Sequence, residues 1–157
     1  MSLKITVSLR ARSVEKWIRT VKRDYLDNAP KKRVGLDREF TNPREGNQCA
    51  AILQLSVASE NLIFQICRED EVPQLLKEFL QDENNKFFGA AIGNDVEMAC
   101  HYGIHITSAF DLQKILPNPT NNPILSLHDL ENSIIEINLE KKNRKMYKKD
   151  TEQKKRK

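Results

Sequence analysis

The sequence contains no long hydrophobic run, no paired-cysteine motif and no apolar leader. Its apolar stretches, such as 52–55 and 61–66, are strand-sized, whereas a membrane-spanning helix needs about 20 apolar residues. We therefore expect no membrane association. The three cysteines are odd in number and lack C-x-x-C spacing, which argues against a disulfide framework or a zinc site and favours free thiols in a reducing compartment.

The absence of a secretory signal favours a nuclear or cytoplasmic location. An organellar location is the alternative, because the first 23 residues carry seven basic residues and one acid, as presequences do. The alternating apolar residues of that segment favour a folded strand instead.

Positive charge is concentrated at the C-terminal end of the chain. The net charge is +4, but residues 140–157 hold ten Lys or Arg and three acids, so the remaining 139 residues carry a net charge of −3. We predict one domain over 1–139 and a basic, disordered tail over 140–157. Three interpretations of the tail stay open: a solvated end, a nucleic-acid-binding arm, or a nuclear-import signal centred on 154–157. The candidate nucleic-acid contacts are Lys141, Lys142, Arg144, Lys145, Lys148 and Lys149.

Hydrophobic periodicity predicts a mixed α/β domain. Leu3, Ile5, Val7 and Leu9 alternate as in a half-buried strand, and helical spacing follows them. Three closely spaced strands after residue 33 predict an antiparallel meander. In order, we expect strands at about 3–9, 34–40, 49–57, 61–67 and 86–91, and helices at about 13–27, 71–81, 94 or 95 to 103, 109–116 and 126–137.

Two carboxylates, Asp37 and Glu39, lie in the segment Val34–Phe40 (VGLDREF). Because side chains alternate along a strand, residues two apart lie on the same side. Two neighbouring acids repel each other, and a divalent cation between them removes that cost. The alternative is an ordinary solvated strand end. A second segment, Phe87–Asp95 (FFGAAIGND), ends at an aspartate that begins a predicted helix, where it could also serve as an N-cap.

These segments resemble the motifs of the DEDD 3′–5′ exonuclease superfamily. VGLDREF is similar to the first motif, V-G-[FL]-D-x-E-[WF], and residues 52–56 (ILQLS) are similar to the L-Q-L-[AS] strand that follows it. Phe87 to Asp95 is similar to the second motif, F-x-G-x-x-I-x-x-D. Within the superfamily the resemblance is to the Werner-syndrome-type and ribonuclease D-type branch common in plants. It covers roughly residues 1–140 and implies a ribonuclease H-like mixed β-sheet flanked by helices.

The resemblance implies hydrolysis of a phosphodiester bond by two Mg²⁺ or Mn²⁺ ions about 4 Å apart. In that scheme Asp37 bridges both ions, Glu39 holds one and helps to orient the attacking water, and Asp95 holds the other. The implied substrate is DNA or RNA with a free 3′ end.

The third motif of the family, Tyr-x-x-x-Asp or His-x-x-x-x-Asp, is not found at its expected place. Tyr147 and Asp150 are one residue too close together and lie in a charged segment without an apolar stripe. We therefore expect a C-terminally truncated, degenerate exonuclease with little or no activity, a pseudoenzyme that acts through a protein partner or self-association at the surface exposed by truncation. The alternative is an active Mg²⁺- or Mn²⁺-dependent exonuclease that receives a carboxylate from a partner or a second copy.

Overall fold

The computed structural model describes residues 2–40, 50–66, 71–92 and 103–116. The chain divides into two units, Met1–Ile115 and Leu116–Lys157, and all of the second unit except Leu116 lies outside the described residues. The predicted domain boundary at residue 139 and the predicted helix at 126–137 lie there too. Most of the predicted helix from 94 or 95 to 103 is also outside the described residues. Its expected end, Gly103, has φ +65°, a left-handed conformation that suits glycine after a helix.

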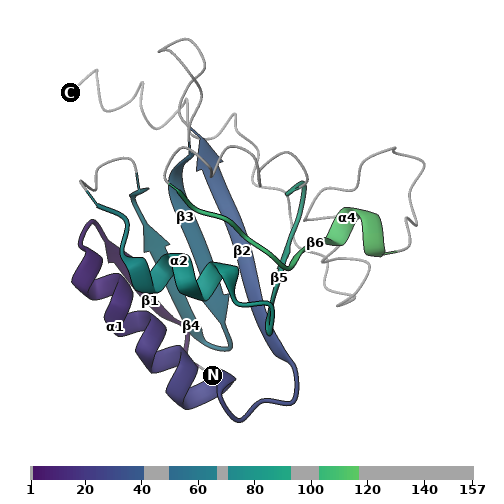
Figure 1. The fold of residues 1–157 in the computed structure, drawn as a ribbon, viewed down its shortest axis with the longest axis horizontal. Helices are drawn as coiled ribbons and strands as arrows, with labels where there is room; N and C mark the ends of the chain where they lie inside the picture. Colours follow the sequence, from purple (N-terminus) through teal and green to yellow (C-terminus); the bar gives the residue numbers. More distant parts are fainter. Residues whose placement is uncertain (1, 41–49, 67–70, 93–102, 117–157) are drawn as a thin grey trace, which may run out of the picture. The chain divides into compact units, whose positions relative to one another are not determined.

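A six-stranded mixed sheet in the order β1-β4-β3-β2-β5-β6 forms the centre of the first unit (Figure 1). The strands β2, β3 and β4 are the predicted antiparallel meander, whereas β1, β5 and β6 each run parallel to their neighbour. This arrangement confirms the predicted ribonuclease H-like fold class. The strands are β1 (Lys4–Ser8), β2 (Lys32–Phe40), β3 (Ala50–Val57), β4 (Glu60–Phe64), β5 (Asn85–Gly89) and β6 (Ala109–Asp111).

Two helices cover the same face of this sheet (Figure 1). Helix α1 (Ala11–Val21) continues into a π-helical turn, η1 (Lys22–Leu26), and α2 (Gln74–Gln81) lies beside it. We call the sheet face beneath them the helix face, and the opposite face, which neither α1 nor α2 covers, the open face. The helical spacing of apolar residues explains this arrangement, because Val14, Trp17, Ile18 and Val21 form one stripe that is buried.

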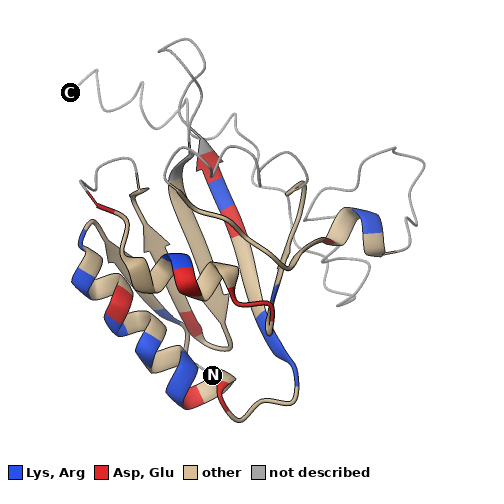
Figure 2. Cartoon of the chain, viewed as in Figure 1, with Lys and Arg blue, Asp and Glu red and all other residues tan. Residues whose placement is uncertain are grey.

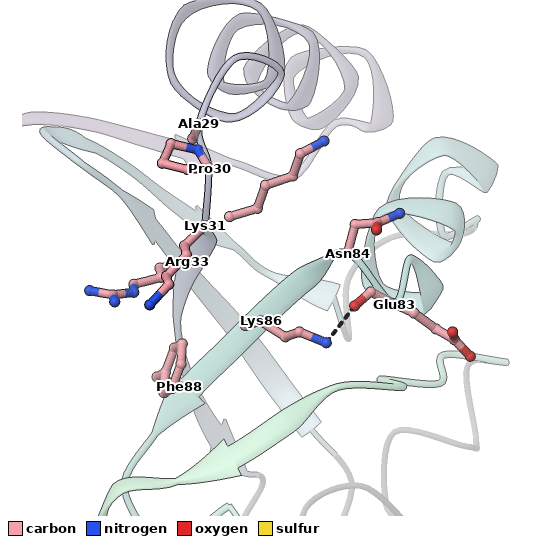
Figure 3. A pocket seen from close by; sticks show the side chains of 9 residues that line it. Ala29, Pro30, Lys31, Arg33, Glu83, Asn84, Lys86 and Phe88 are labelled. Atoms are coloured by element: carbon pink, nitrogen blue, oxygen red, sulfur yellow. Dashed lines mark hydrogen bonds between the residues drawn. The ribbon is translucent and has the colours of Figure 1, made fainter.

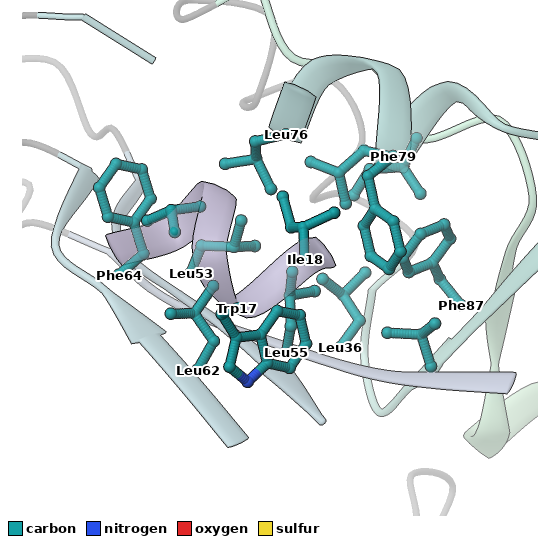
Figure 4. Close-up of a cluster of buried hydrophobic side chains, with 14 of the residues drawn as sticks. Trp17, Ile18, Leu36, Leu53, Leu55, Leu62, Phe64, Leu76, Phe79 and Phe87 are labelled. Carbon is teal, nitrogen blue, oxygen red and sulfur yellow. The ribbon is translucent and has the colours of Figure 1, made fainter. Parts of the chain in front are cut away.

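The hydrophobic core lies between the helices and the helix face (Figure 4). The ring of Phe79 on α2 is in T-shaped contact with Trp17 of α1, at 6.5 Å, and with Phe87 of β5, at 5.8 Å. Edge-to-face contacts of this kind add to the stabilisation from burying three large rings. They fix β5 against the helices, and β5 leads into the second motif.

Two sequence predictions need correction. The helix predicted at 109–116 begins as strand β6, because residues 109–111 pair with β5, and only Leu112–Ile115 (α4) is helical. The apolar side of β1 is not half-buried: Leu3, Ile5, Val7 and Leu9 are 44–70% exposed. The other side of that strand faces α1, where the Lys4 ammonium lies 3.2 Å from the Glu60 carboxylate.

Among the described residues, no helix has the length and apolar character needed to cross a bilayer.

Candidate metal site on strand β2

Asp37 and Glu39 lie on the open face, near the carboxyl end of β2. Both are exposed, while Leu36 and Arg38 between and beside them are buried on the helix face. Figure 2 shows the alternation of acidic and basic residues along this end of the strand. The prediction that the two carboxylates share one side of a strand is therefore confirmed.

Local backbone contacts position both acids. The Asp37 carboxylate accepts a hydrogen bond from the Arg38 backbone N–H at 2.8 Å, which restrains its side chain. Glu39 lies at a β-bulge, because it pairs with Ile52 whereas the next residue, Phe40, pairs with Ala50. A bulge bends the strand that carries the extra residue. That residue is Ala51, so the bend is in β3, opposite the second carboxylate of β2.

Gly89 brings the second motif against the first. A Cβ atom built on Gly89 would lie 2.3 Å from the carbonyl oxygen of Leu36, which directly precedes Asp37. Only glycine allows so close an approach of the two backbones. The end of β5 thus lies against β2 beside the acid pair, at the point where the chain turns toward Asp95.

Asp111 holds this turn in place. Its carboxylate accepts the backbone N–H of Ala91 at 3.2 Å and that of Gln113 at 2.9 Å. Ala91 has φ +56°, which a non-glycine residue adopts only with support from its surroundings. Sequence reasoning missed Asp111, because its role depends on the pairing of β5 with β6. Ile92, the last described residue before Asp95, is buried in the core.

Asp95 itself lies outside the described residues, as do the six basic residues predicted to contact nucleic acid and the residues Tyr147 and Asp150. Among the described residues, no group of three or more His, Cys, Asp and Glu side chains gathers closely enough to hold a metal ion. Asp37 and Glu39 supply the hard oxygen donors that Mg²⁺ and Mn²⁺ prefer. The donor chemistry therefore fits a divalent cation, with the pair as a partial ligand set.

Comparison with known proteins places the chain in a family. A family model described as 3′–5′ exonuclease matches residues 14–156. The chain belongs to the 3′–5′ exonuclease family. The matched span runs through the segment predicted to be a basic tail. No curated protein sequence matches the chain.

Solved exonuclease structures share the fold. Escherichia coli RNase D superimposes with a TM-score of 0.69 at 15% identity, covering 89% of this chain and 36% of RNase D. The Aedes aegypti Nibbler EXO domain gives 0.67 at 10% identity, covering 91% of this chain and 75% of that one. The EXD2 exonuclease domain soaked in Mg and GMP gives 0.59 at 18% identity, covering 86% and 70%.

Proposed function

We propose that this chain is a divalent-metal-dependent exonuclease domain that acts on the free 3′ end of DNA or RNA, and that its activity as an isolated chain is feeble. The observation that carries the proposal is the exposure of Asp37 and Glu39 on one face of β2, with Gly89 of the second motif packed against the same strand. We also assign the chain to the Werner-syndrome-type and ribonuclease D-type branch, which the fold of RNase D supports. Its plant-like character stays a prediction from sequence.

The acid pair would hold the metal. Asp37, restrained by its bond to the Arg38 N–H, and Glu39, on the same side of β2, would hold the ion, and Glu39 would help to orient the attacking water. A bound Mg²⁺ or Mn²⁺ would supply Lewis-acid chemistry, lowering the pKa of water and stabilising charge on the leaving oxygen. Structures of the EXD2 exonuclease domain soaked in Mg and in Mn support this choice of cation. Asp95 follows Ile92 by three residues, and we assign it as the third ligand.

Feeble activity follows from the missing third motif. No tyrosine or histidine stands at the family spacing from an aspartate in the C-terminal segment. The resemblance to the exonuclease superfamily implies that such a group positions the nucleophilic water and that the aspartate completes the ligand set. Losing preorganised groups of this type commonly costs orders of magnitude in rate. We therefore expect slow shortening of the nucleic-acid substrate, unless a partner or a second copy supplies the missing groups.

A nuclease assay on 5′-labelled DNA and RNA tests the proposal. The full chain is incubated in Mg²⁺ or Mn²⁺ with substrates whose 3′ ends are free or blocked. We expect slow stepwise shortening of the free ends, abolished by Asp37→Asn. Asp27→Asn is the matched control, because it removes the same charge from an exposed position just after η1. If the Asp37 variant and the wild type shorten the substrate equally, the acid pair is not the catalytic centre.

A second candidate function is self-association without catalysis, and the exposed side of β1 favours it. Ile5 and Val7 are 61% and 62% exposed, and β1 is an edge strand of the described sheet. An apolar edge strand is a common template for pairing with another chain. Sedimentation of the wild type and of Ile5→Ser/Val7→Ser tests this function. A monomeric wild type would reject it, and a dimer lost in the double variant would support it.

A further inference from the structure

A second candidate site lies at the opposite end of β2 from the acid pair (Figure 3). It is a hollow of about 440 Å³ where β2 and β5 begin, between the turn that precedes β2 and the turn that follows α2. Four of its nine lining residues are basic and one is acidic. The lining residues are Ala29, Pro30, Lys31, Lys32, Arg33, Glu83, Asn84, Lys86 and Phe88.

The positive charge of this hollow is largely uncompensated. Lys31 and Arg33 are exposed, and no carboxylate of the described residues lies within ion-pair distance of either. The Lys86 ammonium donates to neutral acceptors, the backbone oxygen of Glu83 at 2.7 Å and the Ser108 hydroxyl at 3.4 Å (Figure 3). Lys32 differs, because it faces the helix side and is one of the charges that lower the pKa of Asp82.

An aromatic surface adjoins the charge. Phe88 lines the hollow, and its ring stacks on Phe110 with centroids 5.4 Å apart and planes 24° from parallel. Strand pairing puts Gly35, Phe88 and Phe110 in one row across three strands. Gly35 has no side chain to cover the row, and Phe110 is 39% exposed. Nucleobases stack on rings presented in this way, with little preference for sequence.

The basic hollow, the aromatic row and the acid pair share the open face of the sheet. Along β2 this face carries Arg33, Gly35, Asp37 and Glu39 in turn. Asp37 is four positions after Arg33 along the strand, which is ~13 Å at 3.3 Å per residue. Single-stranded nucleic acid carries both phosphates and bases and can extend over such a distance.

We propose that the hollow binds the phosphodiester backbone of single-stranded nucleic acid through Lys31, Arg33 and Lys86, while a base extends the stack that Phe88 and Phe110 form. This site is separate from the metal ligands. It deepens the proposed function and rests on it in one respect, that nucleic acid held here extends along the open face toward Asp37 and Glu39. Binding itself needs neither metal nor cleavage, so it is measured without them.

The test is fluorescence anisotropy of the full chain with labelled single-stranded DNA and RNA in EDTA, over a series of salt concentrations. The variant Lys31→Gln/Arg33→Gln removes two contacts. Each phosphate contact to a single strand contributes about 0.7 to the slope of log affinity against log salt. We therefore expect a slope less steep by about 1.4 and an affinity about 25-fold lower at 0.1 M salt, on a 1 M reference. The variant Phe110→Leu should lower the affinity without changing the slope.

The matched control is Arg12→Gln/Lys16→Gln, which removes the same charge from exposed positions on α1, away from the open face. It should keep the wild-type affinity to within a factor of a few. Equal affinities and slopes for the two double variants would overturn the proposal, since binding would then follow net charge alone. Binding of inorganic phosphate to the hollow without any loss of oligonucleotide affinity in Lys31→Gln/Arg33→Gln would overturn it too. Failure of the nuclease assay leaves this test unaffected, because no cleavage is measured.

Discussion

Replacing Gly89 with alanine tests whether the contact between the two motifs builds the metal site. The new Cβ atom would lie 2.3 Å from the Leu36 carbonyl oxygen and 2.8 Å from the Cγ2 atom of Ile92. Real Cβ atoms essentially never approach another atom more closely than 3.0 Å, so β5 and β2 must separate by at least 0.7 Å. The obstacle is backbone, which cannot rotate away as a side chain can.

The expected loss of stability is worked out from two opposing effects. Overpacking in a well-packed region costs about 1–3 kcal/mol, and a backbone obstacle places Gly89→Ala at the upper end. Alanine also restricts the unfolded chain, which returns about 0.4–1 kcal/mol. The net loss is therefore about 2 kcal/mol. Gly35→Ala is the matched control on β2. Its Cβ would lie 3.2 Å from the Ser56 Cβ and 3.6 Å from the Ser56 carbonyl oxygen, and we expect a change within about 1 kcal/mol.

Urea unfolding of both variants measures the difference. With a slope of about 2 kcal/mol per molar for a small domain, Gly89→Ala should lower the midpoint by about 1 M. Mn²⁺ affinity, followed by electron paramagnetic resonance, should also fall in Gly89→Ala and hold in Gly35→Ala. Equal midpoints and equal Mn²⁺ affinities for the two variants would refute the idea that this close approach positions the site.

Two further predictions concern stability. Phe79→Ala removes the ring between Trp17 and Phe87 and should lower the free energy of unfolding by about 3–5 kcal/mol. Urea unfolding measures this loss, and its dependence on urea concentration should stay unchanged. A loss below about 1 kcal/mol would contradict the packing described. The Asn84 N–H, then the Asn84 side chain, with Lys32 and Lys22, hold the pKa of Asp82 below its usual value. This stabilisation is present above about pH 4 and is lost as the pH falls through the lower folded pKa. Asp82→Ala should therefore cost about 1 kcal/mol at pH 7 and less as the pH falls below about 4, and an equal cost at every pH would exclude this cause.

The sequence was sufficient to predict β2, which carries the acid pair, and β5, which packs against it. Alternation in Val34–Phe40 separates two apolar residues, Val34 and Leu36, from two acids, and the structure places these sets on opposite faces of β2. Short spacing between strands predicts the antiparallel meander, because only tight turns fit between them. These inferences depend on local periodicity, which a single strand carries by itself.

Predictions that depend on distant neighbours were less reliable. Alternation shows that the two sides of β1 differ, but not which side faces a helix, and the side with Lys4 faces α1. Residues 109–116 have helical spacing, yet pairing of Phe110 with Phe88 draws the first three residues into the sheet. In residues 109–111 the tertiary contacts outweigh the local preference, whereas in β1 they decide only which side of the strand faces the helix. The hydrogen bond between Asp111 and Ala91 could not be predicted from the sequence for the same reason, since the two residues are twenty positions apart.

The two ends of β2 should respond to different perturbations, which makes their roles separable in one protein. The acid pair near its carboxyl end acts through a bound cation, so a chelator removes that contribution and leaves Lys31 and Arg33 as they are. The basic hollow acts through exposed charges, whose interactions are screened over about 10 Å at 0.1 M salt. Because ~13 Å of strand separates Arg33 from Asp37, screening at that ionic strength already weakens direct coupling between the two ends. In EDTA, salt should therefore lower the affinity for single-stranded nucleic acid as strongly in Asp37→Asn as in the wild type. A salt dependence that differs between them would mean that the two ends form one electrostatic site.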